Sequence, residues 1–355
     1  MPDGTKRVFY VKYLAHDIYA EILGARKDVR LDKLENESAD DTAAPVLAGA
    51  HAYQIGASRD ELARKYHAGP DLLRRTQSLL IVSTNGAGYD TVNLKACTEA
   101  GILCLNQAGG NKEAVAEHAL AMMLSLSKRI VEADKAIRRE VLDRNSFIGH
   151  DLFGQTVGIV GLGNVGKRLA QLCAGLFSMR VLSYDPYVSA EIMKQHGVEK
   201  VDLATLLREA DFVSINCPLT DESRGMIGQA QYALMKPNAY FVTTARGSIH
   251  DEVALEAALR AKKIAGAGLD VWEKEPPPLD HPLLRYDNVM VSPHTAGVTH
   301  EARVTMGRIA AEQILAALDG KPVTRVLNPQ VWPRYAARFR ETFGITPEGP
   351  AIAGG

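Results

Sequence analysis

Three polar side chains in the second half of the chain have the types needed for acid–base chemistry on a carboxylate-bearing molecule. Arg246 and His294 each follow an apolar run, and Glu275 lies in a proline-rich loop. An imidazole transfers protons near neutral pH, a carboxylate on its other ring nitrogen would stabilise the imidazolium, and a guanidinium presents a planar fork to a carboxylate. These types suit the oxidation of a 2-hydroxy acid, in which the hydroxyl proton leaves while C2 delivers hydride to a nicotinamide.

Each of these residues also has a structural interpretation when it is taken alone. Arg246 could form a structural ion pair, Glu275 could be a solvated loop acid, and His294 could be a histidine satisfied near a turn. All three, however, lie at the ends of predicted strands, and the carboxyl ends of parallel strands share one edge of a sheet. We therefore predict that they form one site.

A glycine-rich turn predicts that this edge also binds a dinucleotide. An apolar strand leads into Gly161-Leu-Gly163-Asn-Val-Gly166, an amphipathic helix follows, and a second apolar run ends on Asp185. In such a unit the glycines allow a tight turn, close approach to a pyrophosphate and close helix packing, while the helix N-terminus faces the phosphates. Asp185 would accept the ribose hydroxyls and repel a 2′-phosphate, which favours NAD over NADP. The alternative is an ordinary turn tightened by glycine.

Composition limits the other classes of function. The 355 residues suit two domains, 46% are apolar, and 41 basic residues balance 42 acidic ones, so neither a nucleic acid nor an anionic membrane is an expected partner. We expect no secretory signal and no membrane span, because no long apolar run occurs. The four cysteines form no CxxC pair, so we expect no metal site and a reducing, cytoplasmic location.

Strands alternate with helices along the chain, which predicts an α/β fold with doubly wound parallel sheets. Early strands are expected at 7–14, 45–47, 52–55 and 79–83, a helix at 60–65, and a surface connection at 28–45. The loop Asn85-Gly86-Ala87-Gly88 follows a strand, and we prefer substrate binding to a plain turn there. A second helix and strand follow at 93–100 and 102–105.

Residues 112–139 predict one long, glycine-free helix, which could bridge two domains, form a dimer surface or simply pack in a core. After Asp185, helices are predicted at 190–196, 203–209, 229–235, 251–262 and 301–318, and strands at 199–201, 212–216, 239–243, 266–269 and 289–291. The closing residues, AIAGG, are expected to be disordered.

Several motifs together resemble the D-isomer-specific 2-hydroxyacid dehydrogenase family, over about 79–327. They are GLGNVG with Asp185, CPLT at 217–220, TTARGSIHDE at 243–252, AGAGLDVWEKEPP at 265–277, HPLL at 281–284 and SPHTAGVTHEA at 292–302. The resemblance implies two Rossmann-like domains, with the nucleotide domain inserted into the substrate domain. The substrate domain would comprise 1–112 and 295–355, and the NAD-binding domain 113–294.

The resemblance also implies roles. Arg246 would bind the substrate carboxylate and carbonyl, His294 would be the acid/base with Glu275 as its partner, and Asp270 would approach the nicotinamide carboxamide. The expected cofactor contacts are Gly161, Gly163, Asn164, Val165, Gly166, Asp185, Cys217, Pro218, Thr220, Thr244, Ala245, Asp270, His294 and Gly297. The expected substrate contacts are Asn85, Gly86, Ala87, Gly88 and Arg246, and a homodimer is expected.

Some features depart from the family pattern or leave alternatives open. His250 stands where the family usually has Val or Ile, no regulatory extension follows the last family helix, and the loop 54–59 has no arginine cluster, which disfavours phosphoglycerate as substrate. Formate dehydrogenases have Gln in place of Glu275. Phosphite dehydrogenases share the Arg, Glu and His set, and NAD-sensing corepressors share the fold and the set. Neutral charge and compact length favour an NAD-dependent enzyme acting on a D-2-hydroxy acid or its 2-keto acid.

Overall fold

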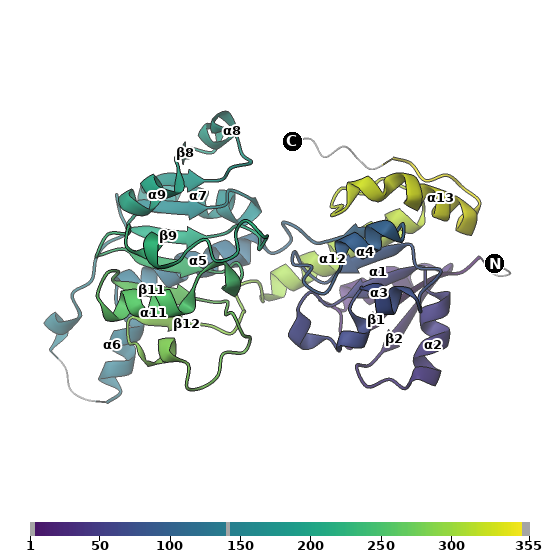
Figure 1. The fold of residues 1–355 in the computed structure, drawn as a ribbon, viewed down its shortest axis with the longest axis horizontal. Helices are drawn as coiled ribbons and strands as arrows, with labels where there is room; N and C mark the ends of the chain where they lie inside the picture. The colour runs from purple at the N-terminus through teal and green to yellow at the C-terminus, as the bar shows by residue number, and fades with distance from the viewer. Residues whose placement is uncertain (1–3, 140–142, 350–355) are drawn as a thin grey trace. The chain divides into compact units, whose positions relative to one another are not determined.

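The computed structural model describes residues 4–139 and 143–349, and the chain divides into two compact units. One unit comprises 1–111 and 299–355, and the other comprises 112–298 (Figure 1). The chain therefore passes from one unit to the other twice. The second passage lies four residues later than the sequence suggested, because the backbone N–H groups of Thr295 and Ala296 donate to the carboxylate of Asp270.

The first unit contains a five-stranded parallel sheet in the order β2-β1-β3-β4-β5. Helices cover both faces of the sheet, and their packing on each face forms an apolar core. Strands β3 and β4 are buried at every position, as expected for parallel strands covered on both sides. The strands are β1 (Lys6–Val11), β2 (Val29–Leu34), β3 (Ala52–Ile55), β4 (Ile81–Thr84) and β5 (Leu103–Leu105). Helices α1 (Ile18–Gly24), α12 (His300–Leu318) and α13 (Trp332–Phe343) share one core, and α2 (Asp40–Gly49), α3 (Pro70–Leu73) and α4 (Leu94–Glu99) share the other.

The second unit contains a seven-stranded parallel sheet in the order β12-β11-β10-β9-β6-β7-β8. Its strands are β6 (Thr156–Val160), β7 (Arg180–Tyr184), β8 (Glu199–Lys200), β9 (Phe212–Ile215), β10 (Tyr240–Thr243), β11 (Gly266–Leu269) and β12 (Val289–Val291). Helices α5 (Lys112–Ser127), α7 (Asn164–Phe177) and α8 (Ala190–Gln195) contribute to one core, and α9 (Leu203–Glu209), α10 (Gln229–Tyr232) and α11 (Glu252–Arg260) to the other. The predicted fold class, α/β with doubly wound parallel sheets, is confirmed.

Three expectations for the early part of the chain are wrong. The segment 28–45 is not a surface connection, because β2 pairs with β1 along its whole length and α2 follows it. The expected strand at 45–47 lies inside α2, with Pro45 within the helix, because Ala43 and Leu47 are four residues apart and both pack into the core. The helix expected at 60–65 is replaced by two 3₁₀ turns, η1 (Arg59–Glu61) and η2 (Arg64–Tyr66).

One later expectation also needs correction, and one helix was not predicted. The long helix predicted over 112–139 is two helices, α5 and α6 (Ile130–Ile137), because Arg129 adopts a left-handed backbone conformation with φ 54°. Helix α13 was not expected, and it buries Tyr335 and Phe339 against the sheet of the first unit. The closing residues AIAGG, expected to be disordered, lie outside the described residues.

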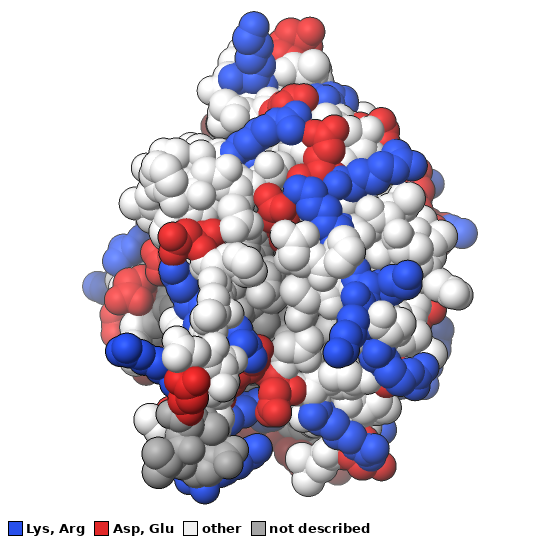
Figure 2. All heavy atoms as spheres, turned by 90° about the vertical axis from the view of Figure 1, so that its left-hand side faces the viewer, with Lys and Arg blue, Asp and Glu red and all other residues white. Residues whose placement is uncertain are grey.

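The surface of the chain carries both signs of charge. Figure 2 shows Lys and Arg side chains interspersed with Asp and Glu over the face that it draws. Within the residues that the structure describes, no helix combines the length and the apolar character needed to cross a bilayer.

Candidate active site

A histidine–carboxylate pair lies at the end of the second unit's sheet. His294 follows β12, and its Nδ1 lies 2.7 Å from Oε2 of Glu275. The other carboxylate oxygen of Glu275 accepts the backbone N–H of Trp272 at 3.1 Å, which fixes the orientation of the carboxylate. The side chains of His294 and Glu275 are 36% and 22% exposed, so the pair is partly shielded but still reachable. The predicted partners are thus in hydrogen-bond contact.

This contact changes the acidity of both groups. The hydrogen bond to Glu275 raises the pKa of His294 above its ordinary value, against the opposing effect of burial. Burial alone would raise the pKa of Glu275, but the hydrogen bond and charge of His294, the Trp272 N–H and the charge of Arg246 together hold that pKa below its ordinary value. The pair therefore favours an imidazolium beside a carboxylate, which is the state needed to donate a proton.

Arg246 is positioned by a turn that only glycine permits. It caps η4 (Gly247–Ile249) shortly after β10, and its Nη1 donates to the carbonyl of Ala245 at 2.7 Å. A Cβ on Gly247 would lie 1.9 Å from the carbonyl carbon of Trp272, so η4 packs directly on the backbone that leads to Glu275. The charge of Arg246 lies near enough to contribute to the lowered pKa of Glu275.

Asp270 lies at the end of β11 and is completely buried. Its carboxylate accepts the backbone N–H groups of Thr295 and Ala296 at 2.8 and 3.0 Å and the hydroxyl of Ser292 at 2.7 Å. This predicted cofactor residue therefore holds the turn that carries His294. Gly297 lies in that same turn, and Thr244 and Ala245 join β10 to Arg246.

The predicted dinucleotide turn has the expected local geometry. Gly161 follows β6 with φ +95°, and a Cβ there would lie 2.7 Å from the backbone of Cys217 at the end of β9. A Cβ on Gly166 would lie 2.2 Å from the carbonyl oxygen of Gly161, so helix α7 packs closely on the turn. The strand order reverses between β6 and β9, and this is where open α/β sheets bind ligands.

The residues around this turn fit an adenine dinucleotide. Gly163 is the N-cap of α7, and no side chain of the described residues caps this helix, so its first N–H groups, at Asn164 and Val165, are available to phosphate. Asp185 follows β7, and its two oxygens accept the backbone N–H groups of Leu162 and Tyr187, each at 2.9 Å. Its carboxylate is thus fixed beside the glycine turn. The loop Cys217-Pro218-Leu219-Thr220 follows β9, where Thr220 accepts from and donates to Ser223.

The predicted substrate loop lies in the first unit, after β4. Two of its carbonyls accept hydrogen bonds within the unit: Gly86 O accepts from the Thr84 hydroxyl and the Gln107 N–H, and Ala87 O accepts from the Asn106 side-chain amide. No residue in the described part of the chain accepts a hydrogen bond from the N–H groups of Gly86, Ala87 or Gly88. Asn85 is fixed by Tyr13 and Gln54. The loop therefore presents several backbone donors together, as a carboxylate-binding site requires.

The structure adds two side chains that the sequence analysis did not include. Ser292 bonds to Asp270, and His118 on α5 lies 3.0 Å from the Ser292 hydroxyl. Ser292 stands in the SPHTAG motif, two residues before His294, so its position in the sequence could have indicated a place in the site. Nothing in the sequence marked His118 as a site residue, because its helical spacing is that of a core residue.

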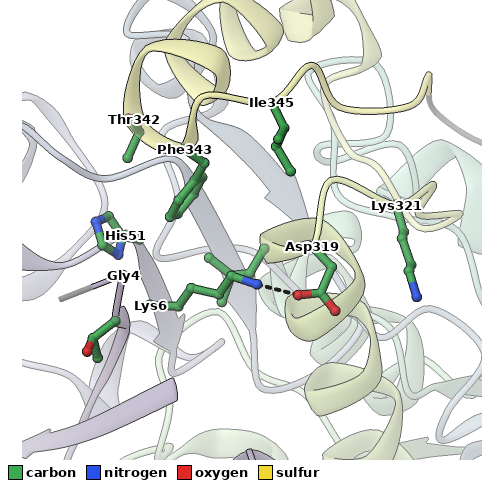
Figure 3. A pocket seen from close by; sticks show the side chains of 10 residues that line it. Gly4, Lys6, His51, Asp319, Lys321, Thr342, Phe343 and Ile345 are labelled. Carbon is green, nitrogen blue, oxygen red and sulfur yellow. Dashed lines mark hydrogen bonds and ion pairs between the residues drawn. The ribbon is translucent and has the colours of Figure 1, made fainter. Parts of the chain in front are cut away.

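A cavity of about 510 Å³ lies elsewhere, in the first unit, where β1 begins. Figure 3 shows Lys6 paired with Asp319 in its wall, near Phe343 and Ile345. None of its lining residues is a predicted site residue, and Arg26 and Asp28 complete the ion pairs beside it. We interpret this wall as structural.

Comparison with known proteins identifies the family. The chain is 39% identical over 265 residues to a glyoxylate reductase of Korarchaeum cryptofilum, and this alignment covers 74% of this chain and 80% of that protein. The chain belongs to the D-isomer-specific 2-hydroxyacid dehydrogenase family. Residues 120–296 match the family model described as "D-isomer specific 2-hydroxyacid dehydrogenase, NAD binding domain". The resemblance seen in the motifs is therefore confirmed, and so is the expectation that the cofactor is NAD.

Other members of this family resemble the chain in sequence and in structure. It is 41% identical over 293 residues to a D-3-phosphoglycerate dehydrogenase of Archaeoglobus fulgidus, which covers 79% of this chain and 55% of that protein. The chain spans about half the length of the phosphoglycerate dehydrogenases that it matches. A crystal structure of D-lactate dehydrogenase from Aquifex aeolicus, complexed with NAD and lactic acid, has a TM-score of 0.75 at 28% identity, covering 88% of this chain and 96% of that one.

Proposed function

We propose that the protein is an NAD-dependent dehydrogenase that interconverts a D-2-hydroxy acid and its 2-keto acid. The observation that carries this proposal is the 2.7 Å contact between His294 and Glu275, in the unit that matches the family's NAD-binding domain. The contact leaves Nε2 of His294 for a substrate oxygen, and the charge of Arg246 lies near enough to affect Glu275.

In the proposed reduction each side chain has a separate task. His294, held as an imidazolium by Glu275, donates the proton on Nε2 to the keto oxygen, and Glu275 stabilises the charged ring before that transfer. Arg246 binds the substrate carboxylate and polarises the carbonyl. In the first unit, the backbone N–H groups of Gly86 to Gly88 are proposed as substrate contacts, because among the described residues they are free to donate to a carboxylate. NADH, when bound, supplies the hydride to C2.

We propose NAD rather than NADP because of Asp185. The carboxylate is fixed by two backbone N–H groups beside the glycine turn, so it cannot move away from a ribose 2′-substituent without losing both bonds. A 2′-hydroxyl can donate to this carboxylate, whereas a 2′-phosphate would be repelled.

The early loop favours a small, unphosphorylated 2-keto acid. Arg59 is the sole basic residue of the loop 54–59, and its Nε donates to the carbonyl of Asp90 at 2.8 Å. A single arginine that already donates one N–H to the backbone offers a phosphate fewer donors than a cluster of arginines would. Glyoxylate is the acid named for one of the matched relatives, and we propose it as the first substrate to test.

The test is a panel of 2-keto acids, comprising glyoxylate, hydroxypyruvate, pyruvate, phenylpyruvate and phosphohydroxypyruvate, assayed with NADH and with NADPH. The proposal predicts NADH oxidation with at least one unphosphorylated acid, a D-2-hydroxy acid as product, and a kcat/KM at least about 10-fold lower with NADPH. Binding of NADH without turnover of any acid would instead support the NAD-sensor interpretation. Turnover of phosphite alone would support phosphite dehydrogenase.

We also propose that the protein is a homodimer and that α6 forms part of the dimer contact. This amphipathic helix buries none of its own residues, and in Figure 1 it stands apart from the sheet of its own unit. Ile130 and Ile137 on it, and Ile148 and Phe153 after it, are 53%, 72%, 73% and 70% exposed. A second copy of this chain would cover these apolar side chains.

We propose a reducing, cytoplasmic compartment for the protein, because its four cysteines are unpaired.

A further inference from the structure

The turn that carries His294 adopts a backbone conformation that needs support. His294 has φ +55°, which lies in the left-handed region that residues other than glycine rarely adopt. Three backbone bonds to Asp270 hold it there: His294 N donates to Asp270 O at 2.7 Å, and the next two N–H groups donate to the Asp270 carboxylate. The aim of the imidazole toward Glu275 therefore depends on where Asp270 is held.

Asp270 is itself held by a directed chain of hydrogen bonds. The Ser292 hydroxyl donates to Oδ1 of Asp270 at 2.7 Å. That hydroxyl has a single hydrogen, so Nε2 of His118, 3.0 Å from the same oxygen, must be the donor in their contact. This series of hydrogen bonds runs from His118 Nε2–H to Ser292 Oγ–H and then to Asp270, and it requires that Nε2 of His118 carries a proton.

The rest of the environment keeps this chain in place. The backbone of Ser292 donates to Leu269 O at 2.9 Å, and its carbonyl accepts the Trp272 indole N–H at 3.2 Å. Asp270 is fully buried, and a buried carboxylate is costly unless hydrogen bonds and nearby positive charge compensate it. Nε2 of His118 lies 3.8 Å from Oδ1 of Asp270, so His118 adds a basic group beside this carboxylate.

We propose that His118 is a positioning residue for the reaction, acting on His294 through Ser292 and Asp270. The proposal rests on the proposed function for its kinetic consequence but not for its structural one. Helix α5 begins at Lys112, where the chain enters the second unit, so His118 connects the first helix of that unit to the turn carrying the acid/base. His118 itself need not touch substrate.

The first test is kinetic, with the full-length protein. His118→Ala and Ser292→Ala should each lower kcat by about 10-fold, because a small displacement of the acid/base is costly, while KM for the keto acid stays within about threefold. His118→Gln keeps an N–H donor and should recover most of the lost kcat. The double variant should be no slower than the slower single variant, because both residues act in one chain. His196→Ala, on the half-exposed end of α8, is the matched control.

The second test needs no turnover. In protein labelled with ¹⁵N-histidine, the His294 amide can be assigned by its absence in His294→Asn. Its hydrogen exchange should accelerate by about 10-fold or more in His118→Ala and in Ser292→Ala, and stay near the wild-type rate in His118→Gln and His196→Ala. Unchanged exchange in His118→Ala, or additive losses of kcat in the double variant, would overturn the inference. A wild type that turns over no 2-keto acid would refute the proposed function, and the exchange result would still decide the inference.

Discussion

At the scale of single residues, one hydrogen bond determines the pH range over which the proposed site can donate a proton. The bond from His294 to Glu275 raises the pKa of the histidine, so the imidazolium persists to higher pH than that of a free histidine. Reduction needs this charged form, and the rate should fall as pH rises through the pKa of His294. Oxidation needs the neutral form and should show the opposite dependence.

Glu275→Gln tests this dependence. The amide cannot stabilise the imidazolium, so the pKa of His294 should fall and the upper limb of the reduction profile should move to lower pH, with kcat at pH 8 reduced by about 10-fold or more. The measurement is kcat for NADH oxidation between pH 5 and 10. Glu273→Gln, on an exposed neighbour in the same loop, should leave the profile in place. An unmoved upper limb in Glu275→Gln would contradict the assigned role.

At the scale of elements, the turn after β10 contains both Arg246, a proposed functional residue, and His250, a residue that lowers the stability of the fold. His250 follows η4 and is 4% exposed, and neither ring nitrogen has a hydrogen-bond partner among the described residues. Burial lowers the pKa of His250 to about 4. The folded protein therefore keeps this ring neutral at pH values where the unfolded chain protonates it.

His250→Val should stabilise the protein, most clearly in mild acid. Below pH about 6.5 the unfolded wild-type chain gains a proton that the folded state does not, so wild-type stability should fall by about 3 kcal/mol between pH 6.5 and 4 from this group. The valine variant lacks that loss, and at pH 7 it should gain about 1 kcal/mol because no polar atom is left unpaired. Urea unfolding at pH 5 and pH 7 measures both. A pH-independent difference between the two proteins would refute this account, and His196→Val, at a half-exposed histidine, is the control.

The elements also show how far sequence patterns reach. The strand–glycine–helix unit, the strands of the second sheet and the positions of Arg246, Glu275 and His294 at strand ends could be predicted, because local periodicity and turn chemistry determine them. Strand β2 and helix α2 could not, because a polar edge strand resembles a loop and Pro45 argues against a helix. The break at Arg129 and the chain through His118 depend on tertiary contacts that leave no local pattern.

At the scale of the whole molecule, exposed apolar side chains gather on and after α6, at Ile130, Ile137, Ile148 and Phe153. Ile137→Glu combined with Ile148→Glu should convert a dimer into a monomer, because each charge would have to be buried in the contact. Light scattering after size-exclusion chromatography should give about twice 38.5 kDa for the wild type and about 38.5 kDa for the double variant. Leu279→Glu, at a site 98% exposed, should remain dimeric. A wild-type monomer would refute the dimer proposal.

The most direct test of the central claim is the reduction rate of His294→Asn. Asparagine tolerates the left-handed backbone of this position better than alanine does, so the turn should persist while the proton donor is lost. With the best 2-keto acid of the panel, kcat should fall by roughly 10²–10⁴-fold and the dissociation constant for NADH should stay within about threefold. A variant that retains near-normal kcat would contradict the claim that His294 transfers the proton.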